Sequence, residues 1–189
     1  KIDAGKLELD TATFDLEEAI FDVMDMLSPL AAQKHIDMAF YYADNVPKHV
    51  VGDALRFKQI LTNLISNAIK FTPDGEIIVR ARMEQDDIGQ CLLHFSVQDS
   101  GIGLSGTDRK KLFESFSQGD ASVTRQFGGT GLGLAISKQL VHLMQGQIGF
   151  EDNQERAPTE KGSTFWFTAM FVVNEEDEYV EHPQFNDMQ

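Results

Sequence analysis

The spacing of hydrophobic residues along the chain predicts where its helices lie. Three long helices are expected, over about residues 15–34, 53–71 and 131–145, and a short one over about 108–116. The first begins with a capping-box pattern, Asp15 followed by Glu18, with Phe14 placed as a hydrophobic staple. The second starts at Gly52-Asp53 and ends at "TPDG", a turn signal. Apolar residues on one side of each helix indicate helices that cover a core.

Runs rich in β-branched and aromatic residues predict the strands. Five are expected, over about residues 36–42, 76–83, 91–99, 146–151 and 163–173. A polar loop is expected over 117–130. This mixture of helices and strands indicates an α+β fold, a two-layer α/β sandwich in which helices lie on one face of a mixed, mostly antiparallel sheet.

Composition and charge narrow the classes of function. The chain has 189 residues, 42% of them hydrophobic, which is enough for one domain with a substantial core. Its net charge of −14 argues against a duplex nucleic-acid footprint, because such a footprint needs a basic face. The single Cys91 excludes an internal disulfide and favours a reducing, cytoplasmic setting. No apolar run approaches the roughly 18 residues of a membrane span, so no direct membrane contact is expected.

Polar residues gather on one side of the second predicted helix, "QILTNLISNAIKF". Asn63, Asn67 and Lys70 fall together, opposite the apolar stripe. A solvated polar face would explain them, yet asparagine is a poor helix former. Two amides at i, i+4 beside a cation also suit a magnesium ion and a polyphosphate, because magnesium takes oxygen ligands and shares the rest with phosphates and water.

The stretch "VQDSGIGLSG" places a carboxylate at the end of a strand, directly before glycines. It spells G-x-G-x-x-G, but no βαβ unit follows, which argues against a dinucleotide fingerprint. Asp99 can only accept hydrogen bonds when ionised, so it could take the exocyclic amine of adenine. Gly101 and Gly103 would let the backbone pass close under the base. An ordinary strand-to-turn sequence remains the alternative.

Four glycines stand between Gly128 and Gly133, immediately before the third long helix. No G-x-x-x-x-G-K-[ST] is present, so this is not a P-loop. The free N–H groups and positive dipole end of the following helix favour an anion, and Thr124 and Arg125 would suit a terminal phosphate. A flexible turn that caps a helix would also account for the glycines.

Taken together, five motifs follow one another in a single order: "NLISNAIKFT", "DSGIG", "LFESFSQ", "GGTGLGL" and "KGSTFWF". Their order and content resemble the catalytic, ATP-binding domain of bacterial sensor histidine kinases, in the group shared with gyrase, Hsp90 and MutL ATPases. The resemblance covers about residues 14–173 and implies a Bergerat-type ATP-binding fold that binds ATP and Mg²⁺. Residues 1–13 then look like a linker from a preceding dimerisation region, and the acidic residues 174–189 like a linker or tail.

The resemblance also implies roles for residues. Asn67 looks like the magnesium ligand, Asp99 holds the adenine amine, and Ser163 or Thr164 helps Asp99 through water. Asn63, Lys70 and Arg125 are the expected catalytic residues, at the phosphates. The expected nucleotide-binding residues are Asn63, Asn67, Lys70, Asp99, Gly101, Gly103, Phe113, Phe116, Gly129, Thr130, Gly131, Leu132, Gly133, Ser163 and Thr164. The phenylalanine and second glycine motifs would flank a lid over ATP.

One part of the family pattern is missing. None of the five histidines stands in the acceptor motif, so the phosphorylated histidine is expected on a separate dimerisation domain. The chain alone is expected to be a monomer, within a whole protein that is a homodimer. The acidic tail resembles the linker toward a response-regulator receiver domain in hybrid kinases of the BarA, GacS and VarS kind, which makes such a domain a further expected partner and suggests an inner-membrane-anchored sensor.

Two other functions stay open. An ATP hydrolase of the same fold would need a glutamate to activate water at the position of Asn63, and an amide cannot serve as that base. A nucleotide-sensing module without phosphotransfer is the other alternative, and the intact motifs are the only argument against it.

Overall fold

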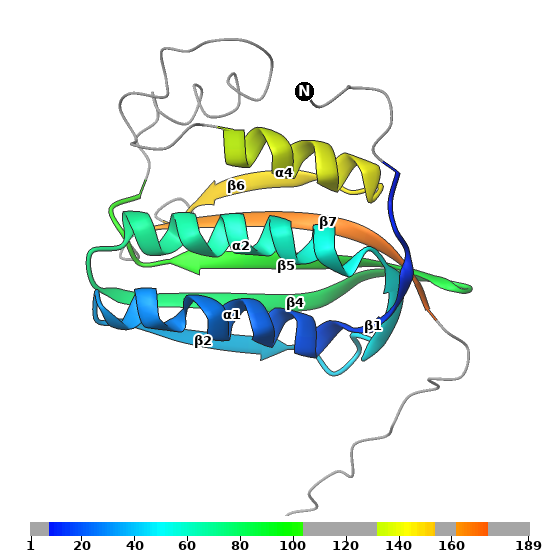
Figure 1. Ribbon diagram of the computed structural model, residues 1–189, viewed down its shortest axis with the longest axis horizontal. Coiled ribbons are helices and arrows are strands. Elements are labelled where there is room, and N and C mark those ends of the chain that lie inside the picture. Colours follow the sequence, from blue (N-terminus) through cyan, green and yellow to red (C-terminus); the bar gives the residue numbers. More distant parts are fainter. Residues whose placement is uncertain (1–7, 104–131, 154–161, 174–189) are drawn as a thin grey trace, which may run out of the picture.

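The computed structural model describes residues 8–103, 132–153 and 162–173 (Figure 1). The described helices are α1 (Leu16–Ala32), α2 (Ala54–Phe71) and α4 (Leu132–Leu143). The described strands are β1 (Ala12–Asp15), β2 (Ile36–Tyr42), β3 (His49–Gly52), β4 (Gly75–Asp87), β5 (Gln90–Asp99), β6 (Ile148–Asp152) and β7 (Ser163–Val173). The predicted short helix over 108–116 and the loop over 117–130 lie outside the described residues.

The described strands form one sheet in the order β1-β3-β7-β5-β4-β2, and β6 pairs with β7. Among the described strand pairs, only β2 and β4 run parallel, and the others are antiparallel. The three described helices lie on the same face of this sheet (Figure 1). The predicted α+β class, with helices on one face of a mixed, mostly antiparallel sheet, is confirmed.

The core between the two layers is built around aromatic rings. Phe57 of α2 lies 4.9 Å from Phe95 of β5 and 6.0 Å from Phe171 of β7, measured between ring centroids. Phe95 also stacks on Phe167 at 5.0 Å. These rings are at most 1% exposed, and burial of each side chain contributes about 1.5–3 kcal/mol. This packing fixes the rotation of α2 about its own axis. The asparagines therefore lie on the side of the helix that faces away from the core.

Two short strands at one edge of the sheet were not predicted. β1 pairs with β3, so residues from Ala12 onward join the sheet, ahead of the expected domain start at Phe14. The ring of Phe14 lies 6.2 Å from Phe57 and 6.1 Å from Phe171, which places it in the aromatic core. Asp15 caps α1 as predicted, accepting a hydrogen bond from the Glu18 N–H at 2.9 Å. Strands of four residues carry too little pattern to be recognised in sequence.

Candidate functional site

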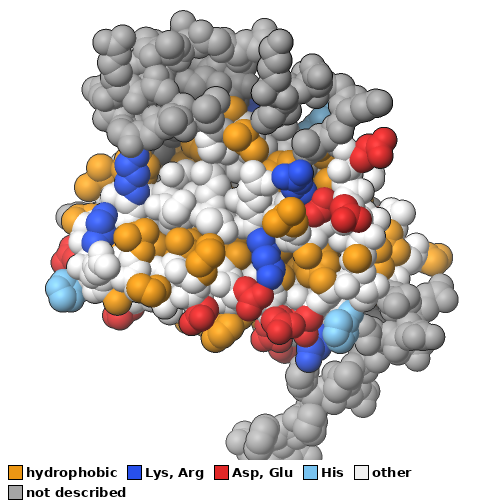
Figure 2. Space-filling model, in the orientation of Figure 1, with side chains coloured by type: hydrophobic (Ala, Val, Ile, Leu, Met, Phe, Trp, Pro, Cys, Tyr) orange, Lys and Arg blue, Asp and Glu red, His pale blue; other side chains and the backbone are white. Residues whose placement is uncertain are grey.

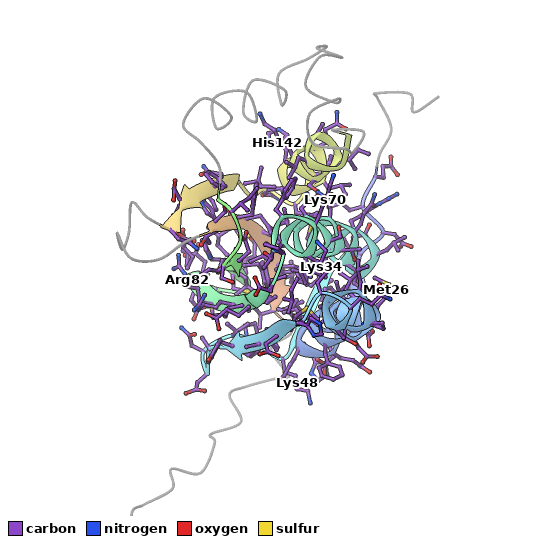
Figure 3. The ribbon with its side chains drawn as sticks, turned by 90° about the vertical axis from the view of Figure 1, so that its left-hand side faces the viewer. Met26, Lys34, Lys48, Lys70, Arg82 and His142 are labelled. Carbon is purple, nitrogen blue, oxygen red and sulfur yellow. The ribbon has the colours of Figure 1, made fainter. Side chains whose placement is uncertain are left out.

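The ends of five elements meet at one end of the sandwich. The end of α2, the ends of β5 and β6, and the starts of α4 and β7 lie together at the left of Figure 1. Figure 3 views the molecule from that side. The fold therefore brings together residues that are far apart in the sequence: Ser163 meets Asp99, and Gly133 meets Asn63.

Asp99, at the end of β5, is the buried acid of this region. Its side chain is 5% exposed, and its Oδ1 accepts a hydrogen bond from the Gly101 N–H at 2.9 Å. Burial raises the pKa of Asp99 to about 6, and the backbone N–H groups of Gly101 and Ser163 oppose that rise. The carboxylate is thus held in place by backbone donors, as an acceptor in a water-poor site.

Glycines are required around this carboxylate because the backbone approaches it closely. A Cβ at Gly101 would collide with the carbonyl oxygen of Phe71 and come within 2.9 Å of Asp99 Oδ1. A Cβ at Gly162 would collide with the backbone carbonyl of Asp99, and Gly162 has φ +95°. Gly103 also has a positive φ, +71°. The "DSGIG" glycines therefore shape the wall beside Asp99.

The two hydroxyl residues at the start of β7 have different neighbours. The backbone N–H of Ser163 bonds to Asp99, whereas Thr164 Oγ1 donates to Asn153 Oδ1 at 2.7 Å. Asn153 in turn donates to the backbone oxygen of Asp99 at 3.0 Å. Ser163 therefore contacts Asp99 through its backbone, and the hydroxyl of Thr164 is used by Asn153. Asn153 was not predicted from the sequence, because its side-chain amide bonds to the backbone of a distant strand and so belongs to no local motif.

Asn63, on α2, links this helix to α4. Its Nδ2 donates to Ser137 Oγ at 3.0 Å, and a Cβ at Gly133 would collide with its amide oxygen. Asn67 follows one turn later, half-buried, and makes no side-chain hydrogen bond with any other described residue. Ser137, two percent exposed, was not singled out in the sequence; only its place one turn after Gly133 could have suggested it.

Lys70, in the last turn of α2, is exposed, and its ammonium lies 5.3 Å from the ring centroid of Phe71. The end of the same helix is capped by Lys34, whose Nζ donates to the carbonyls of Ile69 at 2.8 Å and Lys70 at 3.0 Å. Both lysines are labelled in Figure 3. Lys34 was missed in the sequence because its partners are backbone atoms of a distant helix.

Several predicted site residues lie outside the described residues: Phe113, Phe116, Arg125, Gly129, Thr130 and Gly131. Leu132 begins α4, and its side chain is likewise outside the description. Gly133 is the first glycine of the second glycine motif that the structure describes, and it stands against Asn63 at the start of α4.

We expect Gly133→Ala to weaken nucleotide binding by at least about fivefold. The added methyl would displace the Asn63 amide and break its hydrogen bond to Ser137. Alanine is the better helix former, so propensity alone would favour the variant. Calorimetric titration with ATP would measure the effect. Ser137→Ala removes the same hydrogen bond without added volume and should weaken binding less; wild-type affinity in Gly133→Ala would contradict the proposed role of Asn63.

The fold and this site define a class of protein: an ATP-binding α/β sandwich. The model of the family described as "Histidine kinase-, DNA gyrase B-, and HSP90-like ATPase" matches residues 52–172. The chain belongs to this family, and within it the chain is homologous to the catalytic domains of sensor histidine kinases.

Two relatives illustrate this homology. The sensor histidine kinase GacS of Pseudomonas protegens is 46% identical over 177 residues, which cover 94% of this chain and 19% of that protein. The signal transduction histidine-protein kinase BarA of Escherichia coli is 39% identical over 174 residues, covering 92% of this chain and 18% of that protein. The chain thus spans about a fifth of the length of these relatives.

Solved structures give the same assignment. Full-length ShkA in complex with AMPPNP has a TM-score of 0.70 and 33% identity, covering 89% of this chain and 32% of that one. The catalytic domain of histidine kinase ThkA has a TM-score of 0.62 and 26% identity, covering 85% of this chain and 97% of that one. Within the described residues, none of the helices has the length and hydropathy needed to cross a membrane.

Proposed function

We propose that this chain binds Mg-ATP and passes its γ-phosphoryl group to a histidine on a separate dimerisation domain. The observation that carries the proposal is the buried Asp99 carboxylate, walled by glycines, at the end of β5 and beside the end of α2, the helix that carries the asparagines. Membership of the ATPase family and the likeness to a kinase in complex with AMPPNP support ATP as the nucleotide.

The residues of the site suit both ATP and Mg²⁺. The Asp99 carboxylate would accept from the adenine amine, and the glycine backbone leaves room for a flat base beside it. Asn67, half-buried and without a described side-chain partner, offers an amide oxygen to Mg²⁺. Bound magnesium would neutralise charge on the phosphates. Asn63, Lys70 and Arg125 would position the phosphates, with the N–H groups at the start of α4.

The proposed transfer needs no base from this chain. An imidazole nitrogen of the acceptor attacks the γ-phosphorus, and the bond from that phosphorus to the β–γ bridging oxygen breaks. ADP leaves, and the phosphorylated imidazole releases its remaining N–H proton to water, giving a phosphoramidate. What the chain supplies is position and charge stabilisation, which is most of what phosphoryl transfer requires.

Further partners follow from the relatives. GacS and BarA are far longer than this chain, which leaves room in a protein of that kind for an acceptor domain and a receiver domain. The isolated chain is proposed to be a monomer, in a homodimeric whole protein whose catalytic part is cytoplasmic. On the helix-bearing face, basic side chains are dispersed among acidic ones (Figure 2), an arrangement unlike the basic face that nucleic acid needs.

The test is phosphotransfer between separate molecules. With labelled ATP and Mg²⁺, the chain alone should incorporate almost no phosphate, because none of its histidines stands in an acceptor motif. It should slowly label an added helical domain that carries the family's acceptor histidine, since the encounter is bimolecular. The product should be stable in base and lost in mild acid, as a phosphoramidate is.

The alternatives give other results in the same assay. Rapid ATP hydrolysis without labelling of the added domain would favour a hydrolase. Tight ATP binding without hydrolysis and without labelling would favour a nucleotide sensor. Stoichiometric labelling of this chain, or an acid-stable product on serine or threonine, would contradict the proposal.

A further inference from the structure

Thr72 has a buried hydroxyl that makes no hydrogen bond in the described part of the chain. Its side chain is 0% exposed, and its Oγ1 has no partner. The backbone of the same residue is satisfied: its N–H donates to the Ala68 carbonyl at 3.1 Å, and its carbonyl accepts from Lys34 Nζ at 3.4 Å. A buried hydroxyl without a partner is costly, and such groups in native proteins usually have a ligand, an ion or a water.

The hydroxyl approaches the same glycine as the carboxylate of Asp99. A Cβ built on Gly101 would be 2.9 Å from Thr72 Oγ1 and 2.9 Å from Asp99 Oδ1, so both oxygens face the same glycine. The two residues come from different elements, the end of α2 and the end of β5. Ile102 donates its N–H to the Phe71 carbonyl at 3.3 Å, which ties the glycine loop to the end of α2 and maintains this arrangement.

We propose that Thr72 is a positioning residue of the adenine subsite: its hydroxyl holds a buried water that it shares with the Asp99 carboxylate and the bound base. The inference rests on the proposed function, since it takes Asp99 as the group that binds the adenine amine. A buried water needs two to four polar partners, and the hydroxyl, the carboxylate and a ring nitrogen of adenine supply three.

The hydrogen bond from this water would favour the ionised form of Asp99. Only the ionised carboxylate is a full acceptor for the adenine amine, so ATP binding should weaken as the pH falls through the pKa of Asp99, about 6. Among the described residues, the neighbouring elements bring no titratable side chain to this carboxylate: Ile77 of β4 pairs with it, and α2 and β7 contribute Thr72 and Ser163. Without the Thr72 hydroxyl, the pKa of Asp99 should be higher still.

The experiment compares Thr72→Val, which keeps the shape and removes the hydroxyl, with Thr72→Ser, which keeps the hydroxyl. Thr72→Val should bind ATP about tenfold more weakly, whereas Thr72→Ser should stay within about twofold of the wild type. In nucleotide-free protein, the Asp99 carboxyl titration followed by NMR should move to higher pH in Thr72→Val, and the loss of ATP binding on acidification should begin at higher pH. Thr72→Ala gives the same comparison if the valine variant does not fold.

Thr168→Val is the matched control. Thr168 is also buried, but its Oγ1 accepts a hydrogen bond from the Gln147 N–H at 2.9 Å, and it pairs with His94 rather than with a site residue. This variant should lose thermal stability while the ATP affinity and the Asp99 titration stay as in the wild type. Thr72→Val should show the reverse: unchanged or higher stability with weaker binding.

The outcomes separate this inference from the proposed function. Wild-type ATP affinity and an unchanged Asp99 titration in Thr72→Val would overturn the inference and leave the ATP site intact. Failure of the wild-type chain to bind ATP would overturn the proposed function. The Asp99 titration would still decide whether the hydroxyl acts on the carboxylate.

Discussion

Asp99→Asn should lower the affinity for ATP by about 10–100-fold. The carboxylate is buried and held by backbone N–H groups, so an amide in its place would turn a donor toward the Gly101 N–H or toward the adenine amine. Either orientation leaves a buried polar group without a partner, at a cost of about 1–3 kcal/mol. Calorimetric titration of the variant with ATP at neutral pH would measure the loss.

The pH dependence of the same variant provides a second measurement. The wild type should lose ATP affinity as the pH falls through about 6, where the Asp99 carboxyl becomes protonated. Asparagine does not titrate, so the residual affinity of Asp99→Asn should be flat across that range. Asp37→Asn, at an exposed position on the edge strand β2, is the control and should bind as the wild type. Unchanged ATP affinity in Asp99→Asn, or strong GTP binding by the wild type, would contradict the adenine assignment.

Asn67→Ala should abolish most of the gain in nucleotide affinity that magnesium provides, about tenfold or more. The substitution removes an amide oxygen that has no described side-chain partner, and alanine favours the helix, so stability should be unchanged or slightly higher. The measurement is ATP affinity with excess Mg²⁺ and again with a chelator. The difference between the two should shrink in the variant.

Asn63→Asp is the matched comparison for the magnesium site. It keeps an oxygen on α2 one turn earlier, so it should affect the magnesium-dependent part of binding less than Asn67→Ala does. Its own cost should come from the lost donor to Ser137 Oγ and from added negative charge near the phosphates. Equal shifts of the metal-free and metal-bound affinities in Asn67→Ala would show that Asn67 is not the ligand.

Most of the fold could be predicted from the sequence because its elements are long and regular. The periodic apolar stripe of α2, ending with Ile65 and Ile69 in the core, determined which face carries Asn63 and Asn67. The strand that ends at Asp99 was equally clear. β1 and β3 were missed because four residues hold too little pattern, and they exist only by pairing with each other and with β7.

For the site, the sequence by itself determined which chemical groups are present, because the spacing of a motif follows the geometry of one helix or one turn. The asparagines of α2 were recognised from helical spacing, and Asp99 from its place between a strand and a glycine turn. Only the tertiary structure decided how those groups are supported. Asn153 on the Asp99 carbonyl, Lys34 on the end of α2 and the hydroxyl of Thr72 beside Gly101 join elements far apart in the chain. Contacts between distant segments follow from packing, which leaves no periodic signal in the sequence around them.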